Sequence, residues 1–323
     1  MMIMYQFKKW LSLAALCAGL AAAPSAHAQA VLAGQDAWLF YGHDNMTDAG
    51  QNSITQSVDL MKLASSALQA KDIGLIILVA PMKARFYEDK LPASTQIAAG
   101  VKDRYTRIIN GLDGAGLLAP NLTPILKKVQ QGEQTAFLQK DSHWTAWSAE
   151  AVAAETAKII SGKWKLQGEA GSGQKLGPWT KERHFSDFAQ LMTADQRKKV
   201  GPQIYVVRTA GAQSNGLLDT QKAPVHVIGN SFVQPYLGFT QALSADLDRP
   251  VGLTWKYGNF GPWSVFLDYL ESPEFKQAPP QVIVWQLNET QMLYGPDASG
   301  QWDASSLISP ATWRDRIKNA LKN

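Results

Sequence analysis

An unbroken apolar run at residues 73–80, IGLIILVA, limits the folds open to this chain more than any other segment. It contains no polar side chain and ends at Pro81. A strand with one solvated face alternates apolar and polar residues, whereas a strand covered on both faces is apolar throughout, as in parallel sheets. The run follows residues 57–71, where apolar side chains recur at helical spacing. The two segments, 57–71 and 73–80, therefore predict a helix followed by a buried strand.

Helical and strand-like segments alternate along the rest of the chain. We expect helices at residues 104–112, 123–130, 146–160 and 310–321, and short strands at 204–207, 225–228 and 282–285. Thr145 is a candidate N-cap for the helix at 146–160. Residues 163–183 are poor in aliphatic side chains and hold four glycines and one proline, which predicts a surface loop or hairpin insertion. The alternation predicts an α/β fold, a three-layer α/β/α sandwich on a mainly parallel sheet.

The N-terminus has the three parts of a secretory signal. Lys8 and Lys9 precede an apolar stretch at 10–23, and Ala26-His27-Ala28 forms a small-x-small cleavage site. The apolar stretch is shorter than the roughly 20 residues that span a bilayer. We therefore expect residues 1–28 to be a signal peptide and the protein to be periplasmic, with an uncleaved inner-membrane anchor as the alternative. No repeat or linker divides the remainder, so residues 29–323 are expected to form one domain.

Composition excludes several classes of function. Cys17 is the one cysteine and lies in the signal, which excludes disulfides and thiolate chemistry for the mature chain. The net charge of +4 falls to +2 without Lys8 and Lys9, because 29 basic residues then face 27 acidic ones, so nucleic acid is not an expected partner. The four remaining histidines lack zinc-site spacing, and no metal or other cofactor is expected. Ten tryptophans remain, and exposed indoles are flat platforms for sugar rings.

A serine follows the strand expected at 225–228. The sequence Gly229-Asn230-Ser231-Phe232 comes at once after it. A serine held on a sharp turn there projects its hydroxyl outward, and its own N–H can join an oxyanion hole. The alternative is a serine that caps a helix. The segment also departs from the G-x-S-x-G nucleophile elbow, because residue 233 is valine.

A histidine beside a carboxylate forms the second candidate element, Asp141-Ser142-His143-Trp144-Thr145. It follows the apolar pair Phe137-Leu138 and precedes a helix, so we expect it at a strand-to-helix junction. An imidazole oriented by a carboxylate is a suitable general base for a serine. Two alternatives remain: Asp141 caps the following turn while His143 lies at the surface, or the two residues bind a metal.

Other candidates lie at the ends of expected strands, where α/β proteins place their sites. Lys83 and Arg85 follow the strand at 73–80 and are either solvated charges or groups that meet an anionic substrate or buttress the site. Trp285 ends the last strand, and Tyr257 lies in an aromatic, glycine-containing segment, 255–260, of the kind that could face a sugar.

Together these segments resemble the alginate O-acetyltransferase family, the AlgJ/AlgX-like branch of the SGNH-hydrolase-like proteins. Five blocks occur in the family's order over nearly the whole mature chain. They are the opening GQDAWLF at 34–40, with Ala37 in place of a glycine; PMKAR at 81–85 with Leu91-Pro92; D-x-H-W-T at 141–145; G-[DN]-S-F at 229–232; and residues 282–289, which resemble V-V-W-x-x-x-E.

The resemblance implies an SGNH-hydrolase-like fold with a circularly rearranged order, since the chain runs Asp, His, Ser. It implies Ser231 as nucleophile, His143 as base and Asp141 as the group that orients the imidazole. Substrate contacts are expected from Lys83, Arg85, Trp144, Asn230, Tyr257 and Trp285. Asn230 stands where many members have aspartate. The chain leaves no room for a separate carbohydrate-binding module and so looks more AlgJ-like than AlgX-like.

The activity implied is transfer of acetyl groups to hydroxyls of an exopolysaccharide, alginate-like or other, through an acetyl-Ser231 intermediate. The partners implied are the polysaccharide, a membrane-bound O-acyltransferase that supplies acetyl groups, and other exopolysaccharide export proteins. Two alternatives stay open at this point. One is a carbohydrate acetylesterase with the same triad, and the other is a non-catalytic polysaccharide-binding component of an export complex.

Overall fold

The computed structural model describes residues 30–132, 134–210 and 222–322. The predicted signal peptide, 1–28, lies outside the described residues. Within them, four parallel strands form the central sheet in the order β3 (Gly74–Ala80), β8 (Val282–Asn288), β6 (Val225–Gly229) and β7 (Val251–Trp255). The apolar run at 73–80 is therefore a buried parallel strand, as its sequence predicted.

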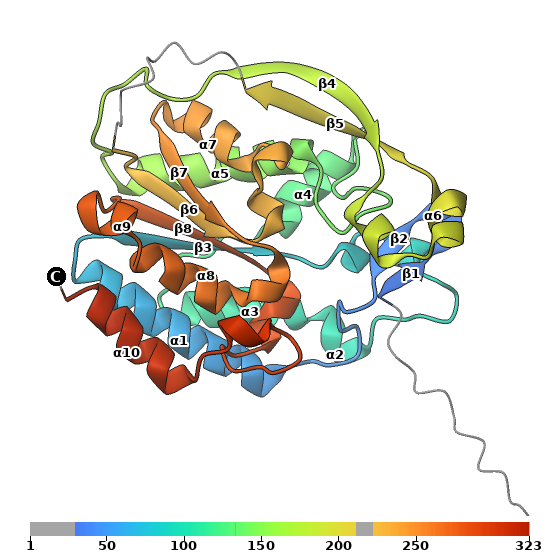
Figure 1. Cartoon of the computed structure of the whole chain (residues 1–323), viewed down its shortest axis with the longest axis horizontal. Coiled ribbons are helices and arrows are strands. Elements are labelled where there is room, and N and C mark those ends of the chain that lie inside the picture. Colours follow the sequence, from blue (N-terminus) through green and yellow to red (C-terminus); the bar gives the residue numbers. More distant parts are fainter. Residues whose placement is uncertain (1–29, 133, 211–221, 323) are drawn as a thin grey trace, which may run out of the picture.

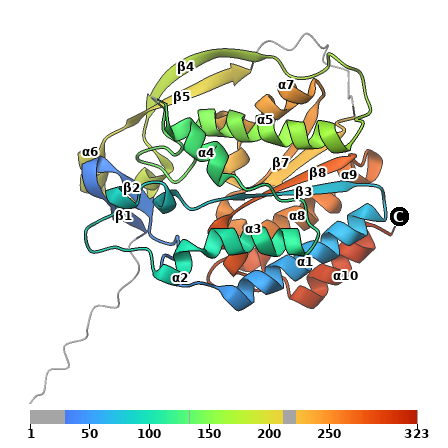
Figure 2. The same cartoon turned by 180° about the vertical axis from the view of Figure 1, so that it is seen from behind.

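Helices cover both faces of this sheet (Figures 1 and 2). On one face lie α4 (Thr123–Gln130), α5 (Ala146–Lys163) and α7 (Phe239–Leu247), and on the other α1 (Gln51–Gln69), α3 (Arg104–Gly114), α8 (Gly261–Leu270) and α10 (Pro310–Ala320). Successive side chains of a strand point to opposite faces. In β3, Ile76 and Leu78 join the first core while Leu75 and Ile77 join the second. The predicted α/β/α sandwich is confirmed.

The helices predicted at 104–112, 123–130, 146–160 and 310–321 are present with bounds that agree to within a few residues, whereas α7 and α8 were not predicted. Thr145 caps α5 as predicted, and its side chain accepts a hydrogen bond from the Ser148 N–H. The helix expected from residue 57 begins earlier, at Gln51. It follows Gly50, whose positive φ of 62° suits glycine because that residue has no Cβ. Short elements complete the fold: β1 (Val31–Ala33), β2 (Leu39–Tyr41), α2 (Ala99–Lys102) and α9 (Pro273–Gln277).

An antiparallel ribbon stands apart from the central sheet. It pairs β4 (Leu176–His184) with β5 (Gln203–Ala210), and α6 (Ala194–Val200) lies between the two strands in sequence. The insertion expected at 163–183 thus supplies β4, and the strand expected at 204–207 belongs to this ribbon. In Figures 1 and 2 the ribbon arches over α5. An ion pair of 3.3 Å between Arg208 and Glu150 ties the ribbon to that helix.

The carboxyl ends of β3, β6 and β8 meet at one edge of the sheet. Ala80 pairs with Asn288, and Ile228 pairs with Trp285, so the three strands finish close together. Loops at this edge are where open parallel sheets bind their ligands. Of the helices in the described residues, none combines the length and apolar character that crossing a bilayer requires.

Candidate active site

Ser231 lies on a tight turn directly after β6. It is the first residue of a 3₁₀ turn, Ser231–Val233, whose N-cap is Asn230. The Asn230 Oδ1 accepts a hydrogen bond of 2.9 Å from the Phe232 N–H, so the asparagine does the capping and the Ser231 hydroxyl does not. A Cβ at Gly229 would come within 2.8 Å of Gln286 Oε1. Glycine is therefore needed there for the close approach of β8.

The Ser231 hydroxyl faces the imidazole of His143. Its Oγ lies 2.8 Å from His143 Nε2, and His143 Nδ1 lies 2.6 Å from Asp141 Oδ1. Because an ionised carboxylate only accepts hydrogen bonds, Nδ1 carries the ring proton and Nε2 accepts from the serine hydroxyl. Asp141 and His143 are buried, and Ser231 is partly exposed. The fold thus brings together three groups from two distant segments in the spatial arrangement carboxylate, imidazole, hydroxyl that hydrolase triads share.

The loop that carries Asp141 and His143 is a compact turn before α5. It is closed by a hydrogen bond of 3.0 Å from the Leu138 N–H to the His143 carbonyl. The strand expected before Asp141 is absent: within the described residues, Phe137 and Trp144 form an isolated antiparallel bridge and not a strand of the sheet. That part of the prediction was wrong because the loop bends back on itself, while the following helix was predicted correctly.

Asp141 both caps the turn and orients the imidazole of His143, the two roles that its sequence left open. Its Oδ1 accepts a hydrogen bond of 3.1 Å from the His143 backbone N–H, which is a turn cap, as well as the bond from the ring. Its Oδ2 accepts from the Tyr205 hydroxyl and from the Asp187 N–H, each at 3.1 Å. The carboxylate therefore has four donors that fix its position.

Tyr205 and Asp187 were not predicted as site residues. Tyr205 comes from β5 of the ribbon, and Asp187 comes from the segment between β4 and α6. Neither has a local pattern that marks it, because both act on Asp141 only through the folding of a segment far away in sequence. The ring of His184 stacks on Tyr205 with centroids 3.9 Å apart and helps to hold it.

Charge attraction sets the protonation of the buried pair. Burial alone would lower the pKa of His143, but the Asp141 carboxylate outweighs it and the pKa is raised above its ordinary value. Burial alone would raise the pKa of Asp141, but attraction to His143 and the hydrogen bonds from it hold that pKa below its usual range. The carboxylate thus stays ionised and favours the protonated imidazole.

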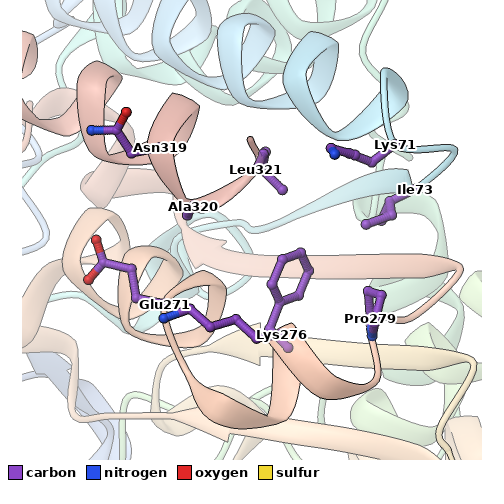
Figure 3. A pocket seen from close by; sticks show the side chains of 9 residues that line it. Lys71, Ile73, Glu271, Lys276, Pro279, Asn319, Ala320 and Leu321 are labelled. Atoms are coloured by element: carbon purple, nitrogen blue, oxygen red, sulfur yellow. The ribbon is translucent and has the colours of Figure 1, made fainter. Parts of the chain in front are cut away.

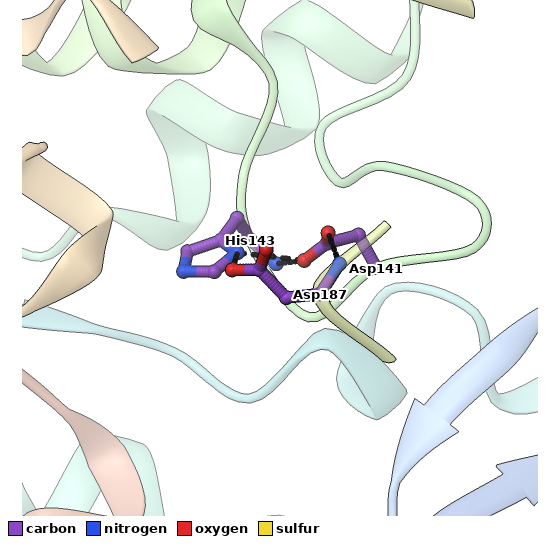
Figure 4. Close-up of side chains that lie close together, drawn as sticks. All are labelled: Asp141, His143 and Asp187. Carbon is purple, nitrogen blue, oxygen red and sulfur yellow. Dashed lines mark hydrogen bonds and ion pairs between the residues drawn. The ribbon is translucent and has the colours of Figure 1, made fainter. Parts of the chain in front are cut away.

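A second carboxylate, from Asp187, lies near the same ring nitrogen (Figure 4). Ligand atoms of Asp141, His143 and Asp187 lie within 4.8 Å of one another, a grouping that could hold a metal ion. However, Nδ1 is already hydrogen-bonded to Asp141 at 2.6 Å and is 4.0 Å from Asp187. Metal binding at Nδ1 would have to break the bond that orients the imidazole toward Ser231.

Ser231 and His143 open into a cleft of about 540 Å³ at the carboxyl edge of the sheet. Loops after β2, β3, β6, β7 and β8 all contribute to its walls. A cavity of about 660 Å³ lies at the opposite edge, where β3 and β8 begin (Figure 3). Its lining contains none of the predicted site residues: it consists of Lys71, Ile73, Glu271, Phe275, Lys276, Pro279, Asn319, Ala320 and Leu321.

Two of the predicted substrate contacts line the cleft with Ser231. Tyr257 is 62% exposed and lies at its wall. Asn230 also lines the cleft, but its amide is engaged, since Nδ2 donates to Gln291 Oε1 at 2.8 Å. Both residues lie at the cleft, Tyr257 has the more accessible side chain, and contact of either with substrate stays a prediction.

Lys83 supports the site from behind. Its Nζ donates to four backbone carbonyls, those of Leu39, Leu138, Gln139 and Asp141, at 2.6 to 2.9 Å. All the hydrogens of an ammonium group are then used, so the prediction that Lys83 binds substrate is corrected. The lysine ties β2 to the loop that bears the triad, which is the buttressing role.

Arg85 is likewise engaged within the protein. Its guanidinium forms an ion pair of 2.6 Å with Glu289 and hydrogen bonds with the carbonyls of Val101 and Lys102. Arg104, which is fully buried, holds the same Glu289 at 2.8 Å. The substrate contact expected of Arg85 is therefore wrong, and its place in the fold is to fix the end of β8.

The two tryptophans expected to bind substrate are in the core. Trp285 is fully buried and stacks on Phe266, with ring centroids 4.1 Å apart. Its side chain points to the α8 face of β8 because side chains alternate along a strand. Trp144 is also fully buried, and its Nε1–H donates to the Phe232 carbonyl at 2.9 Å. Neither ring can touch a substrate, although Trp144 does join the two segments of the triad.

Comparisons with known proteins agree with this fold. The family model described as SGNH hydrolase-like domain, acetyltransferase AlgX matches residues 31–289. The "Probable alginate O-acetylase AlgJ" of Pseudomonas putida is 28% identical over 311 residues, which cover 91% of this chain and 76% of that protein. The alginate biosynthesis protein AlgX of Pseudomonas aeruginosa is 23% identical and matches over 78% of this chain and 54% of its own length.

Solved structures give the same result. The O-acetyltransferase domain of Pseudomonas putida AlgJ superposes with a TM-score of 0.74 at 26% identity, over 90% of this chain and 99% of that domain. Pseudomonas aeruginosa AlgX superposes with a TM-score of 0.62 at 18% identity, over 90% of this chain and 66% of that one, which shows the shared fold. The family model covers most of the chain, so this protein belongs to the family of SGNH hydrolase-like domains of the AlgX acetyltransferase type.

Proposed function

We propose that this protein is an O-acetyltransferase that moves acetyl groups onto hydroxyls of an exopolysaccharide, with Ser231, His143 and Asp141 as its catalytic triad. The observation that carries the proposal is the 2.8 Å contact between Ser231 Oγ and His143 Nε2, with Asp141 on the other ring nitrogen. The family to which the chain belongs and its similarity to the O-acetyltransferase domain of AlgJ support acetyl transfer as the reaction.

In the first half-reaction the serine takes the acetyl group from its donor. His143 Nε2 removes the proton from Ser231 as Oγ attacks the acetyl carbonyl. The imidazolium that forms is stabilised by the adjacent Asp141 carboxylate. Collapse of the tetrahedral intermediate breaks the bond to the donor, which leaves with the proton from His143, and acetyl-Ser231 remains.

The Ser231 N–H, at the start of the 3₁₀ turn, contributes to the oxyanion site. The first N–H groups of a helical turn have no partner within that turn, and the Ser231 N–H is the first here. The Phe232 N–H is already used by Asn230. One well-placed donor stabilises the oxyanion by roughly 3 kcal/mol.

In the second half-reaction a sugar hydroxyl collects the acetyl group. His143, again neutral, accepts the proton of the hydroxyl as its oxygen attacks the acetyl-serine carbonyl. The Ser231 oxygen then leaves and recovers its proton from His143. Water in place of the sugar would give an esterase with the same residues.

The cellular setting follows from the N-terminal sequence. We propose that residues 1–28 direct export, that residues 29–323 form one catalytic domain, and that the reaction takes place in the periplasm. A membrane-bound O-acyltransferase would supply the acetyl groups there, and export proteins of the same polysaccharide system would be neighbours. The names of the relatives, alginate O-acetylase and alginate biosynthesis protein, support a place in exopolysaccharide modification.

The purified protein with a chromogenic acetyl ester as donor tests this proposal. We expect mass spectrometry to find acetylated sugar when a panel of oligosaccharides is present. Release of acetate at the same rate with no acetylated sugar would instead indicate an esterase. Full acetylation of the polymer in cells that carry Ser231→Ala would indicate a binding component without catalytic activity.

A further inference from the structure

Positive charge in the Ser231 cleft is neutralised by the protein itself. Lys83 is the one lysine that lines the cleft, and no arginine lines it, in the part of the chain that the structure describes. The Lys83 ammonium already donates to four backbone carbonyls. Burial also lowers the pKa of Lys83 to about 7. This side chain therefore has no spare hydrogen for an anionic ligand.

Three cations outside the lining, Arg85, Arg104 and Lys256, are also paired. Arg85 and Arg104 both bind Glu289, at 2.6 and 2.8 Å. Lys256, next to the cleft residue Tyr257, forms an ion pair of 2.6 Å with Asp268. The remaining basic groups of the lining are the imidazoles of His43 and His143. No lysine or arginine in the described lining is thus available to a carboxylate on a substrate.

Two carboxylates of the lining, those of Asp44 and Asp187, in contrast have no lysine or arginine partner among the described residues. Asp187 lines the cleft with a side chain that is 54% exposed, and the imidazoles of His143, at 4.0 Å, and His184 lie near it. Asp44 also lines the cleft, near Lys83. Within the described residues, Asp44 has no ion-pair partner within 4.0 Å. Burial, and then the charge of Glu289, raise the pKa of Asp44 to about 7.

The rest of the lining suits an uncharged sugar. Tyr257 and Tyr41 present exposed ring area, 62% and 36% of each residue. The amides of Gln190 and Gln301 add neutral hydrogen-bonding groups. Aromatic rings with a polar end are suited to surfaces that are part apolar and part wet, such as a sugar ring. Carboxylates are good acceptors for sugar hydroxyls because they offer several lone pairs.

These observations separate two classes of acceptor. Uronic acid chains carry a carboxylate on every sugar, and that charge would meet Asp44 and Asp187 with no free cation to offset the repulsion. A neutral chain has no such charge and can donate its hydroxyls to the same two groups. From the charges of the cleft we infer that the acetyl acceptor is a neutral polysaccharide and not a polyuronate, an inference that rests on the transferase function proposed above.

The direct test measures transfer from a chromogenic acetyl ester to matched oligosaccharides. Cellohexaose, mannohexaose and laminarihexaose serve as neutral acceptors, and hexamannuronate and hexaguluronate as charged ones. At about pH 8.5, where ordinary imidazoles are neutral, we expect the best neutral acceptor to exceed either uronate at least about tenfold in kcat/KM. Salt screens like-charge repulsion, so NaCl at about 0.5 M should narrow this gap.

A charge variant localises the effect. Asp44→Asn should reduce the preference for the neutral acceptor at least about threefold, because it removes one of the repelling charges. Asp113→Asn makes the same change on an exposed residue of α3 outside the cleft lining, and it should leave the preference unchanged. The measurement in NaCl needs no variant. If Asp44→Asn does not fold, this measurement still shows whether charge repulsion causes the preference for the neutral acceptor.

Two results would overturn the inference. One is a uronate acceptor that equals or exceeds every neutral one, and the other is no transfer to any neutral hexasaccharide while Ser231 still becomes acetylated. Failure of Ser231 to become acetylated at all would contradict the proposed function and not the choice of acceptor. Measuring acetyl-enzyme and acetylated sugar in the same reaction keeps these two failures apart.

Discussion

The Asp141 carboxylate holds His143 at two points. One oxygen, Oδ1, accepts from the backbone N–H at 3.1 Å and from ring Nδ1 at 2.6 Å. The first bond shapes the turn, and the second turns the imidazole so that Nε2 meets Ser231. A single side chain therefore sets both the backbone and the ring geometry of the general base. This arrangement explains why the carboxylate and the histidine are only two residues apart.

Asp141→Asn should lower kcat for a chromogenic acetyl ester by on the order of 10³ to 10⁴. The amide no longer favours the imidazolium, and it can hold the ring in the wrong tautomer. Because Asp141 raises the pKa of His143, the wild-type rate falls as pH drops through that raised value. The variant's midpoint should lie at lower pH. Stopped-flow rates across the pH range would measure both effects.

Asp187→Asn is the matched control for that experiment. Its carboxylate is 4.0 Å from the same nitrogen but is more than half exposed, so water screens its charge. Its backbone N–H, which bonds to Asp141, is unchanged by the substitution. A loss of activity as large as that of Asp141→Asn would contradict the special role of Asp141.

Tyr205→Phe should change the pH profile without affecting the binding of the ester. The hydroxyl donates to Asp141 Oδ2 at 3.1 Å, and without it the carboxylate attracts the ring proton more strongly. The pKa of His143 should rise further, and kcat near neutral pH should fall by up to about tenfold with KM unchanged. Tyr236→Phe is the control, since that hydroxyl bonds to His184 and Glu182 and not to Asp141. If the pH dependence of kcat in Tyr205→Phe matched that of the wild type, Tyr205 would have no influence on the pKa of His143.

The joining of Ser231, His143 and Asp141 into a triad was implied by the family resemblance, whereas most of the central sheet has local signals, although β7 was not predicted. The apolar run at 73–80 is typical of a buried strand, and strands that end at Gly229 and Asn288 meet at one edge by the geometry of parallel sheets. The D-x-H spacing places the carboxylate within reach of the ring in any tight turn. These features need no knowledge of distant contacts.

The remaining parts of the site depend on distant contacts. Tyr205 reaches Asp141 only because the ribbon folds back over α5, and no pattern near residue 205 shows that. The sequence alone does not distinguish Lys83 from a substrate-binding lysine, because the four carbonyls that its ammonium contacts come from distant segments. Trp285 was placed at the site because it ends a strand, but the face to which its ring points depends on the register of β8.

Glu289→Gln should destabilise the fold by about 3–5 kcal/mol, because it leaves two paired guanidinium groups without their buried carboxylate. The bonds from Arg85 and the charge of Arg104 lower the pKa of Glu289 below 4.5 although burial opposes this. A carboxyl whose pKa is lower in the folded state stabilises the fold above its unfolded pKa and ceases to do so as pH falls. The difference between wild type and variant in urea denaturation should therefore shrink below about pH 4.5.

Glu271→Gln provides the comparison for Glu289. Glu271 also pairs with an arginine, Arg316 at 2.6 Å, but both side chains are more than a third exposed, at 35% and 38%. Exposed ion pairs contribute about 1 kcal/mol or less. Equal losses of stability in the two variants would contradict the structural role given to Glu289.

Asn230→Asp should cost about 1–2 kcal/mol in stability. The carboxylate can still accept from the Phe232 N–H, but it cannot donate to Gln291 Oε1, which also accepts from the Asn288 N–H at 3.0 Å. Two hydrogen-bond acceptors, a carboxylate oxygen of the new aspartate and Gln291 Oε1, would then face each other in the protein interior. Thermal denaturation would measure the effect, and an unchanged melting temperature would show that Gln291 has no part in fixing the turn.

Intact-protein mass spectrometry after brief exposure to an acetyl ester tests the triad most directly. We expect one acetyl group on the wild-type protein, located on Ser231 by peptide mapping. We expect none on Ser231→Ala and slow acetylation in His143→Gln, because the hydroxyl then has no base at 2.8 Å. An acetyl group that forms equally fast in His143→Gln, or that maps to another residue, would contradict the assignment of Ser231 and His143.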